Sequence, residues 1–311
     1  MKQCAVVGSI NMDLVVRAAR FPVPGETLTG MQFETVPGGK GANQAIALAR
    51  LGIPVRMAGM VGGDAFGEAY MEHLKASRVD VSCVGTIKEL PTGIADIVIN
   101  AQGENTIITV PGANAACSKH WMDAVAARMA DCDVFLLQLE LPLEAVGHLA
   151  LRLREIGRTI ILDPAPAASV PDEVLKAIDF LTPNETELRI LTGHMPPDTC
   201  MRHRVEVLHR DFGCTVSHKH GAEGAYICDG EGFRHIPGFT VEAVDTTAAG
   251  DTFNAGLAAG LMQGLTTDKA VRMANAAGAL AVTAFGAQRG MPSIAELMDF
   301  MRLHEGTASV E

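Results

Sequence analysis

A run of small residues near position 250 has the composition of an anion-binding site. Residues 247–251 read TAAGD, and a small-residue helix, Ala255–Met262, follows. Small side chains let a ligand approach the backbone, and the free amides at a helix start carry the positive end of the helix dipole. We therefore predict an anion hole formed by Ala248, Ala249 and Gly250.

We expect Asp251, just before this segment, to lie in the first turn at the helix start. An aspartate there also interacts favourably with the helix dipole, so its position alone does not establish a chemical role. Beside an anion hole, however, a carboxylate can accept the proton of an attacking alcohol while the amides hold a phosphoryl group. The pattern indicates phosphoryl transfer with Asp251 as the general base.

The common nucleotide-binding motifs do not occur in this chain. Lys40 lies in GGKG, residues 38–41, without the spacing of a Walker A motif. No G-x-G-x-x-G follows the first expected strand, which weakens the case for a dinucleotide-dependent dehydrogenase. A kinase of this sequence must therefore hold its phosphates in another way.

The elements that must position these residues alternate between strand-like and helix-like segments. Apolar strand-like runs lie at 4–10, 55–61, 134–139 and 159–162, and helical segments lie at 41–51, 64–75, 119–129 and 143–156. Such alternation predicts an α/β fold, with a mainly parallel central sheet covered by helices on both faces. Asp64 is expected to cap the second of these helices.

Two segments interrupt this alternation and predict a small β-sheet. Residues 14–36 hold two short strand-like runs, and residues 92–110 form a hairpin signal around Gly103. We assign these segments to a β-lid, and residues 1–13, 37–91 and 111–311 to the α/β domain. A sheet over a strand-end pocket can close on a substrate, and its exposed side predicts a homodimer formed through the lid.

Composition narrows the class of protein. The chain has 311 residues and a formal net charge of −11, which argues against nucleic acid and membrane surfaces as partners. Its seven cysteines are odd in number and lack C-x-x-C spacing, so we expect free thiols in a reducing, cytoplasmic environment. No apolar run is long enough for a signal peptide or a membrane helix, and residues 306–311 are expected to form a frayed tail.

Several motifs, in this order, make the chain resemble the ribokinase/phosphofructokinase-B (PfkB) carbohydrate kinases. The resemblance covers nearly the whole chain and implies the ribokinase-like three-layer α/β/α fold. The matching segments are GSINMD (8–13), PVPGET (22–27), GGKGANQA (38–45), PGAN (111–114), QLE (138–140), DPAP (163–166), TPNETE (182–187) and DTTAAGDTF (245–253).

The resemblance implies a sugar site made mainly of carboxylates and amides. These groups suit a neutral sugar, whose hydroxyls both donate and accept hydrogen bonds. Ala95 and Ile107 match lid positions that cover the sugar, and simple packing of the lid is an equally good explanation for them. The implied sugar ligands are Asn11, Asp13, Gly39, Lys40, Asn43, Glu140 and Asp251.

The resemblance also implies ATP and Mg²⁺ as cofactors. Glu187 would lie near Mg²⁺ and hold it through water, as suits an ion that keeps its hydration shell. Asn184 and Glu187 have, in addition, the spacing of a helix capping box, and both roles can hold together. The implied ATP ligands are Asn184, Glu187, Lys219, Gly221, Gly224, Gly250 and Asn275.

A monovalent-cation loop, with potassium as the expected ion, is implied as well. Most of its ligands would be backbone carbonyls, so their side chains matter little. Arg289 and Gly290 stand where relatives usually have Pro-Ser, so one hydroxyl ligand is missing. The implied loop positions are Asp245, Thr247, Ala281, Ala284, Gly286 and Gly290.

Two segments depart from the family pattern. His218 and His220 interrupt what is usually an apolar strand, and we interpret them as polar residues at a strand end without a function of their own. Residues 194–214 differ from the alanine-rich helix that is usual in the family, and the sequence offers no functional explanation for them.

The activity implied is ATP-dependent phosphorylation of D-ribose at its 5-hydroxyl. Deoxyribose, another pentose, a ketohexose or a nucleoside remains an alternative substrate of the same chemistry. A non-catalytic sugar-binding regulator is the alternative from another class, and loss of Asp251 or of Gly250 would favour it. Both residues are present.

Overall fold

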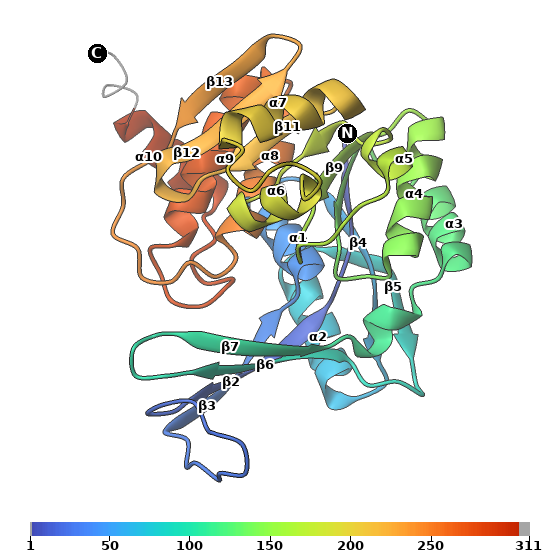
Figure 1. Ribbon diagram of the computed structural model, residues 1–311. Coiled ribbons are helices and arrows are strands. Elements are labelled where there is room, and N and C mark those ends of the chain that lie inside the picture. Colours follow the sequence, from blue (N-terminus) through green and yellow to red (C-terminus); the bar gives the residue numbers. More distant parts are fainter. Residues whose placement is uncertain (1, 305–311) are drawn as a thin grey trace.

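The computed structural model describes residues 2–304, so the tail expected at 306–311 lies outside the described residues. Figure 1 shows a large α/β body and a separate small sheet that projects from it. No helix within residues 2–304 is long and apolar enough to cross a membrane.

The body is built on a nine-stranded sheet in the order β13-β12-β11-β10-β9-β8-β1-β4-β5. All neighbouring strands from β11 to β5 pair in parallel, whereas β12 and β13 add an antiparallel edge. The strands are β1 (Cys4–Val7), β4 (Val55–Gly62), β5 (Asp80–Ile87), β8 (Val134–Gln138), β9 (Thr159–Asp163), β10 (Phe180–Leu181), β11 (Thr215–Lys219), β12 (Gly224–Asp229) and β13 (Gly232–Pro237).

Helices cover both faces of this sheet, because its central strands are apolar on both sides. In β1, Cys4 and Val6 pack into the core that holds α1, α8 and α9, while Ala5 and Val7 pack against α3 and α4. The helices are α1 (Lys40–Arg50), α2 (Ala65–Ala76), α3 (Lys119–Arg128), α4 (Leu143–Glu155), α5 (Asp172–Leu175), α6 (Glu185–Leu191), α7 (Met201–Phe212), α8 (Ala249–Met262), α9 (Thr267–Ala281) and α10 (Ile294–Leu303), with 3₁₀ turns at Gly112–Ala116 and Gly221–Glu223.

The small sheet has four strands in the order β3-β2-β6-β7. They are β2 (Asn11–Arg17), β3 (Gln32–Gly38), β6 (Gly93–Ile99) and β7 (Asn105–Val110). β2 therefore starts at Asn11, slightly before the expected lid segment, and carries both Asn11 and Asp13. In Figure 1 this sheet lies below the body, next to the end at which β1 leads into β2.

The chain reverses its direction of growth across the sheet at β1, whose neighbours are β4 on one side and β8 on the other. Such a switch point leaves a crevice at the carboxyl ends of the strands, where α/β proteins bind ligands. The residues just beyond β1, β8 and β9 therefore lie around one crevice, and the lid sheet starts from the same place.

The α/β architecture predicted from the alternating segments is confirmed. Asp64 caps α2 as predicted, with its side chain accepting from the Gly67 amide. The unexplained stretch 194–214 contains α7 and a loop held by the buried Arg204. This guanidinium donates to the carbonyls of Thr192, Thr199, Pro196 and Pro197, which gives the stretch a structural role.

Candidate active site

The start of α8 has the geometry expected of an anion site. Ala248 precedes the helix in the left-handed conformation, with φ 59°, and so turns the chain sharply into it. The Ala249 amide donates to the Thr246 carbonyl at 3.2 Å. The amides of Gly250 and Asp251 have no acceptor within residues 2–304, so these two amides remain for a ligand.

Asp251 is buried in the first turn of α8, where two amide side chains hold its carboxylate. Asn43 Nδ2 donates to Oδ2 at 3.0 Å, and Gln44 Nε2 donates to Oδ1 at 3.1 Å. Burial raises the pKa of Asp251 to about 6, although Lys40 and these two hydrogen bonds lower it. The group is therefore ionised at neutral pH and is a stronger base than an exposed aspartate.

The predicted sugar residues converge beside Asp251 from three elements. Asn11 and Asp13 come from β2, and Glu140 follows β8. Gly39 has φ 87°, and a Cβ at that position would lie 2.7 Å from the Asn11 nitrogen, so only glycine fits here. This close approach places Lys40 and Asn43, in the first turn of α1, next to β2.

Glu140 fixes the start of α1. Its Oε2 accepts from the Lys40 backbone nitrogen at 3.0 Å and from the Ser9 hydroxyl. A carboxylate at a helix N-terminus also interacts favourably with the dipole. Glu140 thus joins the end of β8 to the turn after β1 and has one oxygen left for a ligand.

The site contains more acid than base. Burial raises the pKa of Asp13 to about 7, and the charges of Glu140 and Asp251 add to the rise. Burial opposes the charge of Lys40, but Asp251, Asp163 and Glu140 together raise its pKa, so it stays protonated. Lys40 is the cation that balances this cluster.

The two predicted lid residues lie on the same face of the small sheet as Asp13 but differ in burial. Ala95 pairs with Asp13 across β2 and β6 and is buried. Ile107 lies on the outer strand β7, where it pairs with Ile97 of β6, and is 53% exposed. The structure therefore places Ala95 at the sugar cluster and leaves Ile107 open to solvent.

All seven predicted ATP residues line one cavity of about 530 Å³, a volume that suits a nucleotide. Asp251 and Lys40 also line it, so the cavity meets the sugar cluster at the start of α8. Asn275 is held in the wall by hydrogen bonds from its Nδ2 to the carbonyls of Ile236 and Pro237. The lining residues predicted from sequence are Asn184, Glu187, Lys219, Gly221, Gly224, Gly250 and Asn275.

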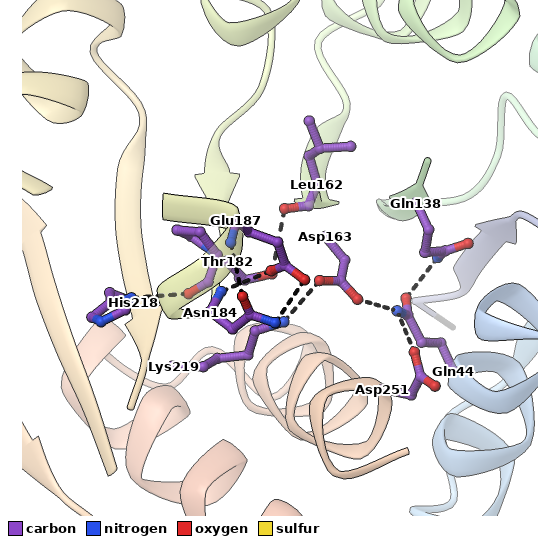
Figure 2. Close-up of polar contacts among 11 residues, drawn as sticks. Gln44, Gln138, Leu162, Asp163, Thr182, Asn184, Glu187, His218, Lys219 and Asp251 are labelled. Atoms are coloured by element: carbon purple, nitrogen blue, oxygen red, sulfur yellow. Dashed lines mark hydrogen bonds and ion pairs between the residues drawn. The ribbon is translucent and has the colours of Figure 1, made fainter. Parts of the chain in front are cut away.

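The wall near Asn184 is polar and tightly connected. Asn184 and Glu187 form the capping box of α6 suggested by their spacing, and Asn184 Nδ2 also donates to Glu187 at 2.8 Å. Burial raises the pKa of Glu187, with Asp163 adding to the rise and Lys219 opposing it. Lys219 forms an ion pair with Asp163 at 2.7 Å (Figure 2).

The loop predicted to bind a monovalent cation is ordered around Asp245. Its Oδ1 accepts from the amide and hydroxyl of Thr247, and its Oδ2 accepts from the Gly286 amide at 2.9 Å. These hydrogen bonds keep the pKa of Asp245 low despite its partial burial. The Gly290 backbone packs against the Ala281 carbonyl, where a Cβ would collide, and Ala284 lies between these two segments.

The two histidines lie at the end of β11 beside the cavity. His218 is fully buried and approaches the Pro183 carbonyl at 3.2 Å through Nδ1, while its Nε2 lies 3.3 Å from His220 Nδ1. Burial lowers the pKa of His218 to about 4, so it is neutral. No group of three metal-ligating side chains occurs in the part of the chain that the structure describes.

Comparison with known proteins identifies the family of the chain. The model of the pfkB family carbohydrate kinases matches residues 1–294. The chain belongs to this kinase family. A ribokinase of Haemophilus influenzae is 39% identical over 96% of this chain and 98% of its own length. A deoxyribokinase of Salmonella typhi is 36% identical over 97% of this chain and 99% of its own.

Solved structures share the fold of this pfkB kinase. Arabidopsis thaliana ribokinase complexed with ribose and ATP superposes with a TM-score of 0.88 at 33% identity, covering 97% of this chain and 99% of that one. The ribokinase-like fold predicted from the motifs is thereby confirmed, with its mostly parallel main sheet and separate four-stranded sheet.

The sequence reasoning missed several residues that support this site in the pfkB kinase. Gln44, Asp163 and Asn114 each lie inside a family motif, but the sequence did not predict a role for them. Asn114 Nδ2 donates to Asn11 Oδ1 at 2.8 Å, and Gln288 Nε2 donates to Asn43 Oδ1 at 3.0 Å. The available signal was the polar residues that stand next to predicted ligands in the motifs, because a polar side chain that becomes buried needs a hydrogen-bond partner.

Proposed function

We propose that this chain transfers the γ-phosphoryl group of ATP to the 5-hydroxyl of D-ribose. Membership of the carbohydrate kinases supports the reaction class. The ribokinase names of its relatives, and the ribose and ATP in the Arabidopsis structure, support the substrates.

The position of Asp251 is the observation that carries the proposal. Its carboxylate lines the nucleotide-sized cavity and is bonded to Asn43 of the sugar cluster. A sugar hydroxyl between Asn43 and the cavity would meet a buried carboxylate on one side and the γ-phosphoryl group on the other. Asp251 accepts the hydroxyl proton as the oxygen attacks phosphorus, and general-base help of this kind is worth ~10²–10⁴ in rate.

The free amides of Gly250 and Asp251 supply the anion hole. They point to the space beyond the start of α8, where they can donate to phosphoryl oxygens. Ala248 was predicted as a member and instead forms the left-handed turn that aims these amides. Ala249 donates mainly to Thr246, so we assign the hole chiefly to Gly250 and Asp251.

Lys219, Asp163 and Glu187 fit a site for the phosphates and for Mg²⁺. Magnesium bound with ATP would neutralise phosphate charge. Both oxygens of Glu187 already accept hydrogen bonds from Asn184, which fits an ion held through water rather than directly. Lys219 is paired with Asp163, and the remaining N–H donors of its ammonium group can bind a phosphate.

The Asp245 loop fits a monovalent cation, which we propose is potassium. A carboxylate and backbone carbonyls are oxygen ligands, as a hard cation requires, and the hydroxyl missing at Arg289-Gly290 is only one ligand. The site is formed by two segments: Asp245 and Thr247 lie just before the Ala248 turn, and residues 284–290 follow α9. A cation bound there would therefore stiffen the chain that supports the anion hole.

The outer face of the lid supports a homodimer. Phe33 and Ile108 are 61% and 66% exposed, and strand pairing places them on the face opposite Asp13 together with Val110. This face is mostly apolar, although the exposed Asp96 lies beside Ile108, and an exposed apolar patch is a typical subunit contact. We propose that a second copy covers it, and that the kinase works in the cytoplasm, as its free cysteines suggest.

A panel of sugars tests the substrate. The purified chain is assayed with ATP at limiting concentrations of ribose, deoxyribose, other pentoses, ketohexoses and nucleosides. We expect the highest kcat/KM with ribose and a product phosphorylated at the 5-hydroxyl. A higher value with deoxyribose would assign the chain to that alternative, and ribose binding in a calorimeter without ADP formation would favour a regulator.

A further inference from the structure

Gln44 is a fully buried amide that joins two carboxylates at the centre of the site. Its Nε2 donates to Asp251 Oδ1 at 3.1 Å and to Asp163 Oδ2 at 3.1 Å. Asp251 lies in the first turn of α8, and Asp163 ends β9. One side chain therefore spans the gap between a helix and a strand whose carboxylates would otherwise face each other across it.

The orientation of this amide is fixed by a second one. Gln138, at the buried end of β8, donates from its Nε2 to Gln44 Oε1 at 2.6 Å. If the Gln44 amide were reversed, its oxygen would face both Asp251 and Asp163, and its NH₂ would face the NH₂ of Gln138. Only the observed orientation lets Gln44 donate to both carboxylates while it accepts from Gln138, whose own Oε1 has no hydrogen-bond partner within residues 2–304.

Figure 2 shows the path that results. Gln138 donates to Gln44, Gln44 donates to both Asp251 and Asp163, and Asp163 pairs with Lys219 in the wall of the cavity. A continuous set of side chains thus runs from Lys219 in the cavity wall to the proposed base, and Gln44 is the member that contacts both Asp163 and Asp251.

We propose that Gln44 is a positioning residue of the phosphoryl transfer, which holds the Asp251 carboxylate toward the sugar hydroxyl and separates it from Asp163. The proposal rests on the role proposed for Asp251 above. With Asn43 on Oδ2 and Gln44 on Oδ1, the carboxylate cannot rotate about its own axis. Gln44 touches neither end of the cavity itself and acts through Asp251.

Removing the Gln44 donor has a predictable effect on ionisation. A hydrogen bond to the charged form lowers the pKa of a carboxyl, and Asp163 raises that of Asp251. Replacing Gln44 with methionine removes the first effect and leaves the second. The other groups facing Asp251 are Lys40 and Asp13, with the Tyr70 phenol nearby, and this substitution changes none of them.

The experiment compares Gln44→Met with Thr192→Val in the full-length chain. Methionine keeps the length and shape of glutamine without its amide. Thr192 is also fully buried and hydrogen-bonded, to Arg204 and Leu188, but it lies outside the site. Both variants lose a buried polar group, so they form a matched pair for stability.

For Gln44→Met we expect kcat to fall roughly 10- to 100-fold, as for loss of one hydrogen bond to a charged group. We expect the acid limb of the kcat–pH profile to move up by about one pH unit, and the KM for ribose to stay within about threefold. Thr192→Val should unfold at lower denaturant concentration and keep the acid limb of the native chain.

Two further variants keep the test decisive. Gln138→Met, which does not touch Asp251, should shift the acid limb in the same direction by a smaller amount, and it serves if Gln44→Met does not fold. An unmoved acid limb in both variants would overturn the proposal. If Asp251→Asn is inactive while Gln44→Met has native kcat and pH profile, only the role of Gln44 fails. If Asp251→Asn is active, the proposed base itself fails.

Discussion

Substituting asparagine for Asp251 tests the central chemical assignment. The change preserves shape but removes the base and the charge. Asn43 and Gln44 both donate to the native carboxylate, so an amide there can accept from one of them but must present its own NH₂ to the other. The variant therefore loses one hydrogen bond in the site, while its fold is retained.

The magnitudes follow from burial. Loss of a general base lowers kcat by ~10²–10⁴. The rise in the pKa of Asp251 from 3.8 to about 6 corresponds to about 3 kcal/mol of destabilisation by the buried charge. Because the folded-state pKa is raised, this penalty is absent below pH 3.8, grows as the pH rises to about 6, and is complete above it.

At pH 7 the asparagine variant escapes that penalty but loses a hydrogen bond worth roughly 1–3 kcal/mol and the charge that faces Lys40. We therefore expect its free energy of unfolding to be close to that of the native chain, while kcat is at least about 100-fold lower.

The assay couples ADP formation to a spectroscopic readout, with ribose and ATP saturating, between pH 5 and 9. The native chain should show an acid limb near pH 6, where Asp251 loses its proton. Asp251 is not the base if the variant keeps more than about a tenth of the native kcat, or if it keeps the same acid limb at reduced rate.

Four further predictions concern Gly39, Arg204, the lid face and the monovalent cation. Gly39→Ala should raise the KM for ribose and destabilise the fold by about 1–3 kcal/mol in denaturant titrations, since φ 87° and the Asn11 nitrogen exclude a Cβ; an unchanged KM would contradict this. Arg204→Met should lower the free energy of unfolding by about 2–4 kcal/mol by leaving loop carbonyls unpaired, yet keep kcat; lost activity in a folded variant would argue against a purely structural role. Phe33→Asp should produce monomers in analytical ultracentrifugation, and a dimer of undiminished affinity would place the contact elsewhere. Potassium should raise kcat relative to a large inert cation at equal ionic strength, and equal rates would remove the proposed ion.

Local patterns were enough to predict the elements that carry the chemistry. The small residues before Asp251 predicted both the helix start and its free amides, because a chain without bulky side chains leaves its backbone accessible. The alternation of apolar strands and helices predicted the parallel sheet, since strands buried on both faces must be apolar throughout.

The sequence could not assign roles to single residues where those roles depend on contacts between distant segments. Ile107 lies on the Asp13 face of the lid and is 53% exposed, so both sugar covering and simple lid packing stay predictions for it. Residues 194–214 had no explanation, because Arg204 acts only on carbonyls that the fold brings around it.

The sequence by itself determined which residues could do chemistry and which elements present them: Asp251 at a helix start, carboxylates and amides after β1 and β8, and a nucleotide wall from Asn184 to Asn275. Tertiary structure alone decided how Asp251 is held. In the sequence, Gln44 lies 207 positions from Asp251, 119 from Asp163 and 94 from Gln138. No local pattern encodes such contacts, because they exist only once α1, β8, β9 and α8 pack at the switch point of the sheet.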